Sequence, residues 1–422
     1  MIKDFLSCYI RPSPRHVEKR ILRLVQHAWG NVPFYRSKME NAGITLADIK
    51  CLDDYVNKFP KTTSAEYRSY QQSTNSKGLI DVRLRPEELI EDRSSGSSGI
   101  TISIHRTLRE NEINRGRALW HLIRAGLRPW HRILAVLPPL QMARSDSTFQ
   151  LFGIFRRTTV NYTMPIQEIV ELIQRTEINV IYGQKSFIRL IADYFSTHGI
   201  PAPKLELLIP GAEKVSESDR KFFFDTFHPT RYCEFYGATE TYLIATRLQN
   251  NYQPDYKAVF FSLVDTKLFD DLTSGSILVT SLINEAQPVL KIELGDRILA
   301  RNYDKLYELG TTIVEVEGRN NDYLVLPNGD RISGATFYAT LEYFPFMRQF
   351  KIVQESVDDC TVFLKISESS EENLTQVEGI LMRLFEGKIR YKIKYVEDIP
   401  MDPNGKTRIL TSNIDRPQIF AH

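Results

Sequence analysis

The ten residues RYCEFYGATE, from Arg231 to Glu240, are the stretch from which the rest of this chain is best understood. A β-prone run predicts a strand that carries Tyr236 to its end, where Gly237 breaks the strand. Thr239 and Glu240 then follow in a turn or a first helical turn. An aromatic face, a hydroxyl and a carboxylate at one sheet edge suit a nucleotide with its Mg²⁺. A plain strand ending in a turn has the same pattern.

Strands and helices alternate upstream of this stretch. This alternation predicts βαβ units and a mainly parallel sheet, in which ligands bind at the carboxyl ends of the strands. Gly211-Ala212-Glu213 and Tyr236-Gly237 both follow predicted strand ends. The predicted strands cover 133–137, 179–182, 205–209 and 232–235, and the predicted helices cover 165–176, 187–197 and 217–227.

The N-terminal part reads as mostly helical. Ser13 and Pro14 form a helix start, Gly30 ends that helix, and residues 31–35 are predicted to be extended. A later helix is predicted to bury an apolar face. That face contains Leu119, Leu122, Ile123 and Leu127.

Downstream of Glu240 the predicted elements become short strands, which indicates a β-rich subdomain. A boundary near Gly318 divides the chain into an N-terminal domain, 1–318, and a small mobile C-terminal α+β domain, 319–422. The C-terminal domain is predicted to contain a hairpin at 323–332 and a helix at 371–385. The fold class is therefore α/β, with mainly parallel sheets and a β-rich subdomain in the large domain.

The composition excludes several classes of protein. The net charge of +2 over 422 residues gives no reason to expect a nucleic-acid partner or a membrane surface. No apolar run is long enough to span a bilayer, and the N-terminus lacks the features of a signal peptide. The four cysteines are scattered without metal-site spacing, which fits a reducing cytoplasm.

A Ser/Gly loop interrupts β-like sequence between residues 82 and 106. Its glycines allow the backbone N–H groups and the hydroxyls to surround an anion. No lysine follows Gly99, so this is not a Walker A loop, and a flexible surface loop has the same composition. The loop consists of Ser94, Ser95, Gly96, Ser97, Ser98 and Gly99.

Five stretches in a fixed order resemble the motif series of the adenylate-forming enzymes, which include acyl-CoA synthetases, adenylation domains and luciferases. The residues at 27–44 and the FPKTT stretch at 59–63 are similar to the phenylacetate–CoA ligase branch, including the CapK-like capsule-biosynthesis enzymes. The resemblance thus covers essentially the whole chain. The five stretches are GAE (211–213), YGATE (236–240), ELGDR (293–297), GRNND (318–322) and DPNGKTR (402–408).

The resemblance implies a binding site for ATP. The Ser/Gly loop is expected to hold the β- and γ-phosphates, and Gly211, Ala212 and Glu213 are expected to line the adenine, with Tyr236 and Gly237 beside it. Asp296 is expected to bind the ribose hydroxyls with help from Arg319.

The resemblance also implies the reacting groups. Thr239 is expected to contact the α-phosphate, Glu240 to bind Mg²⁺, and Lys406 to reach the substrate carboxylate and the α-phosphate. Asp322 is the expected hinge of the small domain. An aromatic acid pocket is expected near Phe149, Phe152, Tyr182 and Tyr236, although core packing explains the same rings.

The implied activity is ATP-dependent activation of a small carboxylic acid to an acyl-adenylate, followed by transfer to coenzyme A. A carrier-protein thiol or an amine is an alternative acceptor, and a homodimer is possible. Two departures affect this reading, because Ile100 and Thr101 replace the cation that usually ends the phosphate loop, and Leu294 replaces a threonine before Gly295-Asp296. A non-catalytic nucleotide-binding regulator and a polysaccharide-binding protein are the rival functions.

Overall fold

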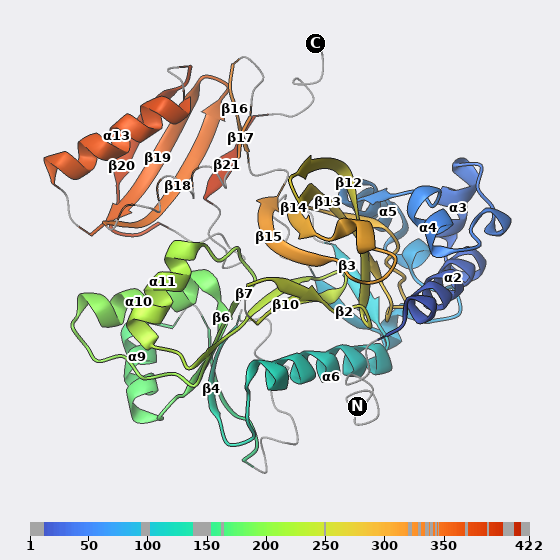
Figure 1. Cartoon of the computed structure of the whole chain (residues 1–422), viewed down its shortest axis with the longest axis horizontal. Coiled ribbons are helices and arrows are strands. Elements are labelled where there is room, and N and C mark those ends of the chain that lie inside the picture. The colour runs from blue at the N-terminus through green and yellow to red at the C-terminus, as the bar shows by residue number, and fades with distance from the viewer. Residues whose placement is uncertain are drawn as a thin grey trace.

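The computed structural model describes residues 12–93, 102–137, 153–161, 164–248 and 250–319, and then 323–327, 331–333, 337, 341, 344, 346–367, 370–385, 388–399 and 409–414. Figure 1 shows a large unit built from the N-terminal elements and a smaller unit built from the C-terminal elements. Within the described residues, no helix has the length and apolar character needed to cross a membrane.

One half of the main sheet is parallel, as the alternation of strands and helices predicts. Its strands lie in the order β9-β7-β6-β4-β5, and every neighbouring pair is parallel. A short strand, β8, pairs with β7. The bounds are β4 Arg132–Leu137, β5 Arg156–Asn161, β6 Val180–Gln184, β7 Leu207–Gly211, β8 Arg231–Tyr232 and β9 Glu234–Ala238.

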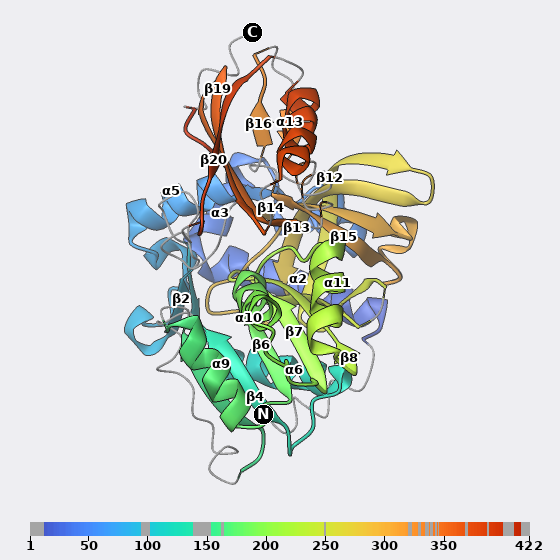
Figure 2. The ribbon, with the colours of Figure 1, turned by 90° about the vertical axis from the view of Figure 1, so that its left-hand side faces the viewer.

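Helices cover both faces of this parallel half, as Figures 1 and 2 show together. The helices α9 (Ile166–Arg175), α10 (Lys185–Thr197) and α11 (Glu217–Phe227) pack on one face, and α6 (Leu108–Ala125) lies on the other. Side chains alternate along each strand, so every strand contributes to both cores. On β7, for example, Leu208 belongs to the core under α9–α11, whereas its neighbours face α6.

The other half of the sheet is antiparallel. The β-rich stretch that the sequence predicts here continues the same hydrogen-bonded sheet from β9, in the order β10-β11-β15-β14-β13-β12. Within this half the link between the β10–β11 pair and the remaining strands is short, because a single pair, Tyr252 and Ile313, joins β11 to β15. The bounds are β10 Tyr242–Arg247, β11 Tyr252–Pro254, β12 Val259–Phe269, β13 Leu272–Ser281, β14 Ile292–Arg301 and β15 Thr312–Arg319.

The N-terminal residues form a helical layer against this antiparallel half. The strand β1 (Thr62–Thr63) pairs in parallel with β14 and ties the layer to the sheet. The prediction that residues 31–35 are extended is wrong, because a helix begins at Pro33. The bounds are α2 Pro14–Asn31, α3 Pro33–Asn41, η1 Leu46–Asp48, α4 Leu52–Asn57, α5 Ser64–Thr74, η2 Lys77–Leu79, η3 Pro86–Glu88, β2 Ile90–Arg93, β3 Ser103–Arg106 and, later in the chain, η4 Tyr303–Lys305.

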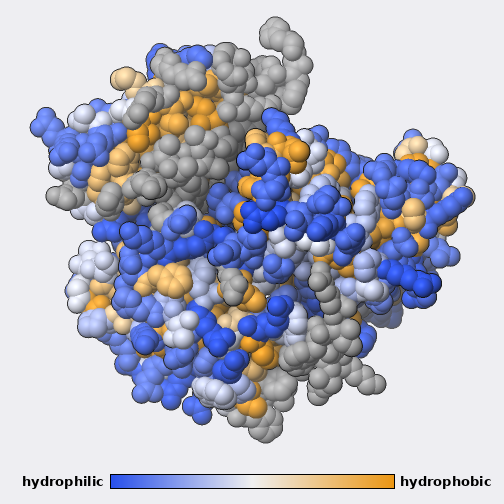
Figure 3. All heavy atoms as spheres, in the orientation of Figure 1, coloured by the Kyte–Doolittle hydropathy of each residue, from blue (hydrophilic) through white to orange (hydrophobic). Residues whose placement is uncertain are grey.

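The C-terminal unit is the α+β arrangement that the sequence predicts. Its sheet has the order β20-β19-β18-β21, and α13 packs on it through Val377, Leu381 and Phe385. Figure 3 shows hydrophilic residues over most of the large unit and apolar residues gathered on this smaller unit. The bounds are β16 Tyr323–Val325, β17 Arg331–Ser333, β18 Met347–Ser356, β19 Asp359–Ile366, α13 Glu371–Phe385, β20 Arg390–Tyr395 and β21 Leu410–Ser412.

Candidate active site

The carboxyl ends of two neighbouring parallel strands bring two of the predicted stretches together. In the register of β7 and β9, Gly211 lies opposite Phe235, so the residues after each strand continue at the same sheet edge. Ala212 has a positive φ of 64°, a backbone conformation that turns the chain sharply away from the strand. Glu213 accepts a hydrogen bond from Gln184 Nε2 at 2.8 Å, which holds its carboxylate beside the end of β6.

A hydrogen bond joins this edge to a third predicted stretch. Tyr236 Oη donates to Asp296 Oδ2 at 2.8 Å, although 60 residues separate them in the sequence. Tyr236 is on β9, and Asp296 is on β14 directly opposite Arg319 of β15. An aromatic ring, a carboxylate that accepts hydrogen bonds, and the backbone of Arg319 therefore meet in one place. This is the grouping that the sequence assigns to a base and its ribose.

Thr239 and Glu240 lie in the tight turn between β9 and β10. Thr241 N donates to the carbonyl of Ala238, and the strands then pair as an antiparallel ladder. Gly237 is required by this approach, because a Cβ there would lie 2.2 Å from the carbonyl oxygen of Tyr242. The turn is therefore fixed by backbone contacts, and Glu240 as a whole residue is only 8% exposed.

Arg106 is a site-supporting residue that the sequence does not reveal. It ends β3, its side chain is buried, and Nη2 donates to the carbonyl of Thr239 at 2.5 Å. A single arginine in a short strand gives no periodicity or motif from which this contact could be predicted. The structure reveals it because its side chain is fully buried, and arginine is rarely fully buried unless its charge is paired.

Tyr182 is the described member of the predicted acid pocket besides Tyr236. It lies on β6, and burial together with the nearby Tyr242 raises the pKa of Tyr182 to about 12, so its hydroxyl stays protonated at neutral pH. Tyr242 directly follows the turn that holds Glu240 and is partly exposed. The predictions for Phe149 and Phe152 lie outside the described residues.

Three other predicted parts of the site also lie outside the described residues. They are the Ser94–Gly99 loop, the hinge Asp322 and the lysine Lys406. For Arg319 the backbone position is described, opposite Asp296. The roles given to all these residues remain predictions.

Glu240 is a suitable ligand for Mg²⁺, because this ion is commonly bound by one or two carboxylates together with substrate phosphates and water. Among the described residues no cluster of three or more histidine, cysteine or acidic side chains could hold a metal by itself. A divalent cation here would therefore depend on the phosphate oxygens of the nucleotide as well as on Glu240.

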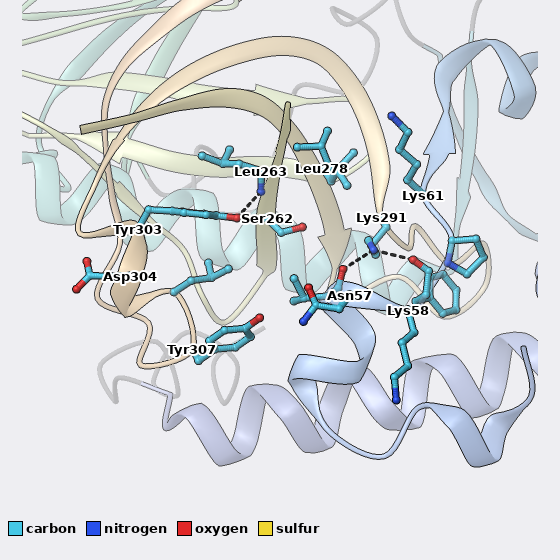
Figure 4. A pocket seen from close by; sticks show the side chains of 15 residues that line it. Asn57, Lys58, Lys61, Ser262, Leu263, Leu278, Lys291, Tyr303, Asp304 and Tyr307 are labelled. Atoms are coloured by element: carbon cyan, nitrogen blue, oxygen red, sulfur yellow. Dashed lines mark hydrogen bonds between the residues drawn. The ribbon is translucent and has the colours of Figure 1, made fainter. Parts of the chain in front are cut away.

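A cavity of about 680 Å³ lies elsewhere and shares none of the predicted site residues. Figure 4 shows Lys291 in its wall, with the ammonium donating to the backbone carbonyls of Val56 and Phe59 at 2.7 and 2.6 Å. These contacts bind the end of α4 to the start of β14. The lysine thus fastens the helical layer to the strand that carries Asp296.

Replacing Lys291 with methionine is expected to change the pH dependence of stability. Burial and the nearby Lys61 lower the pKa of Lys291 to about 8, against about 10.4 for a free lysine. Between these values the unfolded chain binds a proton that the folded chain does not, so wild-type stability rises with pH. The melting temperature of the wild type relative to the variant should therefore rise from pH 7 to pH 9.5.

Lys58 provides the matched control, because it lies at the same cavity but its side chain is 54% exposed. Its hydrogen bond to Asp54 raises the pKa of Lys58, so it stays charged throughout this pH interval in both states. The melting temperature of Lys58→Met relative to the wild type should be constant. An equally constant difference for Lys291→Met would contradict the shifted titration of Lys291.

Comparisons with known proteins agree with this architecture. The CapK C-terminal domain model matches residues 324–413. A phenylacetate-coenzyme A ligase from Thermus thermophilus is 25% identical over 335 residues, which cover 73% of this chain and 71% of that protein.

Solved structures extend the agreement to the whole fold. A 2-hydroxyisobutyryl-CoA ligase in the postadenylation state is similar with a TM-score of 0.75 and 16% identity, covering 96% of this chain and 90% of the other. An open conformation of that ligase, with 2-HIB-AMP and CoA, has a TM-score of 0.61 at 16% identity, covering 95% and 91%. The resemblance predicted from the sequence is therefore confirmed: this chain has the fold of the adenylate-forming ligases, is similar in sequence to a phenylacetate–coenzyme A ligase and matches the CapK C-terminal domain model over residues 324–413.

Proposed function

We propose that this chain is an ATP-dependent, AMP-forming ligase that activates a small carboxylic acid and transfers it to coenzyme A. The observation that carries the proposal is the hydrogen bond of Tyr236 to Asp296 beside the Glu240 turn. It supports the proposal because it gathers an aromatic ring and a carboxylate near the Glu240 turn, at the carboxyl edge of a parallel sheet, where such sheets bind ligands. Asp296 would then accept hydrogen bonds from the ribose, and Glu240 would hold Mg²⁺.

The first step joins the acid to AMP. An oxygen of the substrate carboxylate attacks the α-phosphorus, and the bond to the bridging oxygen breaks, so that pyrophosphate leaves and an acyl-adenylate remains. Two anions must approach each other, which requires cationic groups at the developing charge. Lys406 would supply one, and Mg²⁺ held by Glu240 would neutralise phosphate charge when bound. Tyr236 and Asp296 would orient the nucleoside.

The second step transfers the acyl group. The thiolate of coenzyme A attacks the acyl carbonyl, a thioester forms and AMP leaves with the bonding electrons. Lys406 would have to move away first, by rotation of the 319–422 domain about Asp322. The solved forms of the 2-hydroxyisobutyryl-CoA ligase support the idea of such a rotation, because that ligase is described both in a postadenylation state and in an open conformation, and this chain matches the two forms at TM-scores of 0.75 and 0.61.

Exchange of labelled pyrophosphate into ATP, measured with a panel of carboxylic acids, tests the first step. The expected result is exchange that depends on one class of acid and on Mg²⁺. Absence of exchange with every acid, while ATP still binds, would favour the nucleotide-binding regulator suggested by Ile100 in place of a cation. Glycan binding without any nucleotide would favour the polysaccharide-binding protein.

The acceptor needs a separate experiment once the acid is known. Coenzyme A, a phosphopantetheine carrier protein and amines are offered in parallel, and the products are identified by mass spectrometry. A thioester with free coenzyme A is the expected product. Thioester only on the carrier protein, or an amide, would replace coenzyme A as the acceptor without changing the adenylation step.

A further inference from the structure

Arg106 is a buried charge whose presence needs a reason. Its side chain is only 1% exposed, and burial lowers the pKa of Arg106, although a guanidinium stays protonated in proteins. A buried charge is costly unless every part of it is paired, and a well-packed apolar side chain is often at least as stabilising. Stability alone therefore does not explain why an arginine is buried at this position.

The guanidinium joins three separate segments of the chain. Nη1 donates to Asp92 Oδ2 at 2.6 Å, and Nη2 donates to the carbonyls of Thr239 and Glu240 at 2.5 and 3.4 Å. Nε lies 3.4 Å from Asn284 Oδ1, and Asn284 Nδ2 in turn donates to the carbonyl of Glu240 at 3.1 Å. The carbonyl of Glu240 is thus held from two sides.

One of the three segments is the hairpin of β2 and β3. Asp92 pairs in register with Ile104, one pair from the loop end of the hairpin, whereas Arg106 pairs with Ile90 at the open end. The loop from Ser94 to Thr101 connects these two strands in the sequence. Arg106 and Asp92 therefore fix the strands from which that loop departs, whatever conformation the loop adopts.

The second segment is the Thr239–Glu240 turn. Two peptide carbonyls held by one guanidinium set the orientation of both peptide planes, and hence the direction in which the Glu240 side chain leaves the backbone. The Glu240 carboxylate lies near the same cluster. Its charge raises the pKa of the buried Tyr67, and the charge of Arg106 lowers that pKa.

We propose that Arg106 is a positioning residue, which holds the Glu240 turn and the base of the Ser/Gly hairpin in one fixed relation. This inference rests on the proposed function, in which the loop binds the β- and γ-phosphates and Glu240 binds Mg²⁺. The loop and Glu240 would have to contact the same triphosphate. Their relative position would therefore decide whether Mg²⁺ can bind the carboxylate and the phosphates together.

Arginine suits this task better than lysine because its planar fork donates in several fixed directions, whereas an ammonium on a flexible stem reaches fewer partners. Arg106→Lys keeps the buried positive charge opposite Asp92 but cannot satisfy Asp92, Asn284 and both carbonyls together. Arg117→Lys is the matched control, because Arg117 is also a buried arginine and is paired with a carboxylate, Asp255.

The experiment measures Mg²⁺ dependence in two ways. Binding of ATP is followed by calorimetry across a Mg²⁺ titration, and pyrophosphate exchange is followed across the same titration. For Arg106→Lys we expect the half-saturating Mg²⁺ concentration to rise at least about tenfold, as for other residues that orient a metal ligand. The exchange kcat should fall about 10²-fold, with the KM for the acid unchanged.

A purely structural role predicts a different result. Both lysine variants would then lower the melting temperature, and neither would move the Mg²⁺ requirement. An unchanged Mg²⁺ requirement in Arg106→Lys, or an equal shift in Arg117→Lys, would overturn the proposal. Wild-type protein that binds Mg·ATP but exchanges no pyrophosphate would refute the proposed function instead, while the calorimetric comparison would still decide the role of Arg106.

Discussion

Replacing Lys406 with alanine should abolish most pyrophosphate exchange while ATP binding persists. In the adenylation step the negative charge of the carboxylate and the α-phosphate develops at one point, and preorganised cations at such a point typically supply 10²–10³-fold of the rate. We therefore expect a loss of at least about 10²-fold in kcat. The ATP affinity should change little, because Tyr236, Asp296 and Glu240 are untouched.

The two half-reactions separate this role from a general loss of structure. If Lys406 leaves before transfer, the variant should still convert a chemically prepared acyl-adenylate and coenzyme A to the thioester at a near wild-type rate. Lys392→Ala is the control, because Lys392 is an exposed lysine of β20 in the same C-terminal unit. Undiminished exchange in Lys406→Ala, or equal losses in both half-reactions, would contradict the assigned role.

The parallel half of the sheet could be predicted because its signal is local. Each strand and helix between Ile133 and Phe235 repeats an apolar pattern within its own length, and the carboxyl ends of parallel strands must meet at one edge. The adjacency of Gly211 and Phe235 follows from that rule alone. The hydrogen bond from Tyr236 to Asp296 does not, because it depends on how β14 is reached from β9 through four antiparallel pairings.

Helix α6 shows that a periodicity argument can find only part of a buried surface. The predicted positions Leu119 and Leu122 are partly buried and pack against the core, Leu127 beyond the helix end is buried, and Ile123 is half-buried. The helix also buries a mostly polar face, with Glu110, Asn114, Gly116, Arg117, His121 and Ala125. Such a face is stable only when distant residues complete its hydrogen bonds, and a single sequence does not show which residues those are.

Two preferences of proline disagree at the start of α3. Pro33 favours extended backbone for the preceding Val32, and extending this preference as far as Tyr35 gives the predicted extended segment. Proline at the first helical position is equally a helix start. The structure follows the second rule, with Pro33 at N1 and Phe34, Tyr35 and Met39 buried.

The polar face of α6 leads to the largest stability effect that we expect. Asp255, between β11 and β12, is paired with the Arg117 guanidinium, and its Oδ2 lies 3.0 Å from His121 Nε2. His121 Nδ1 in turn lies 2.9 Å from Thr246 Oγ1 on β10. All four side chains are buried. This network joins α6 to the sheet next to the strand that follows the Glu240 turn.

Asp255→Ala should therefore lower the free energy of unfolding by about 3–5 kcal/mol, because it leaves the Arg117 charge buried without its partner. Chemical unfolding followed by circular dichroism measures the loss. Replacing both partners, in Arg117→Met with Asp255→Leu, should recover much of it, since an apolar pair of similar volume is often as stable as a buried ion pair. A double variant as unstable as Asp255→Ala would show that the His121 contact is the essential one.

Lowering the pH should destabilise the protein through the same carboxylate, Asp255. Although burial opposes ionisation, the His121 and Arg117 contacts hold the pKa of Asp255 at about 2, below its value of about 3.9 in an unfolded chain. The folded state then binds fewer protons than the unfolded state between these values, so the stability from Asp255 is complete above about pH 4 and is lost as the pH falls towards 2. The wild type and the double variant should accordingly differ in the slope of stability against pH in this interval. Parallel slopes would mean that Asp255 titrates normally, and the network would then stabilise α6 through packing and not through charge.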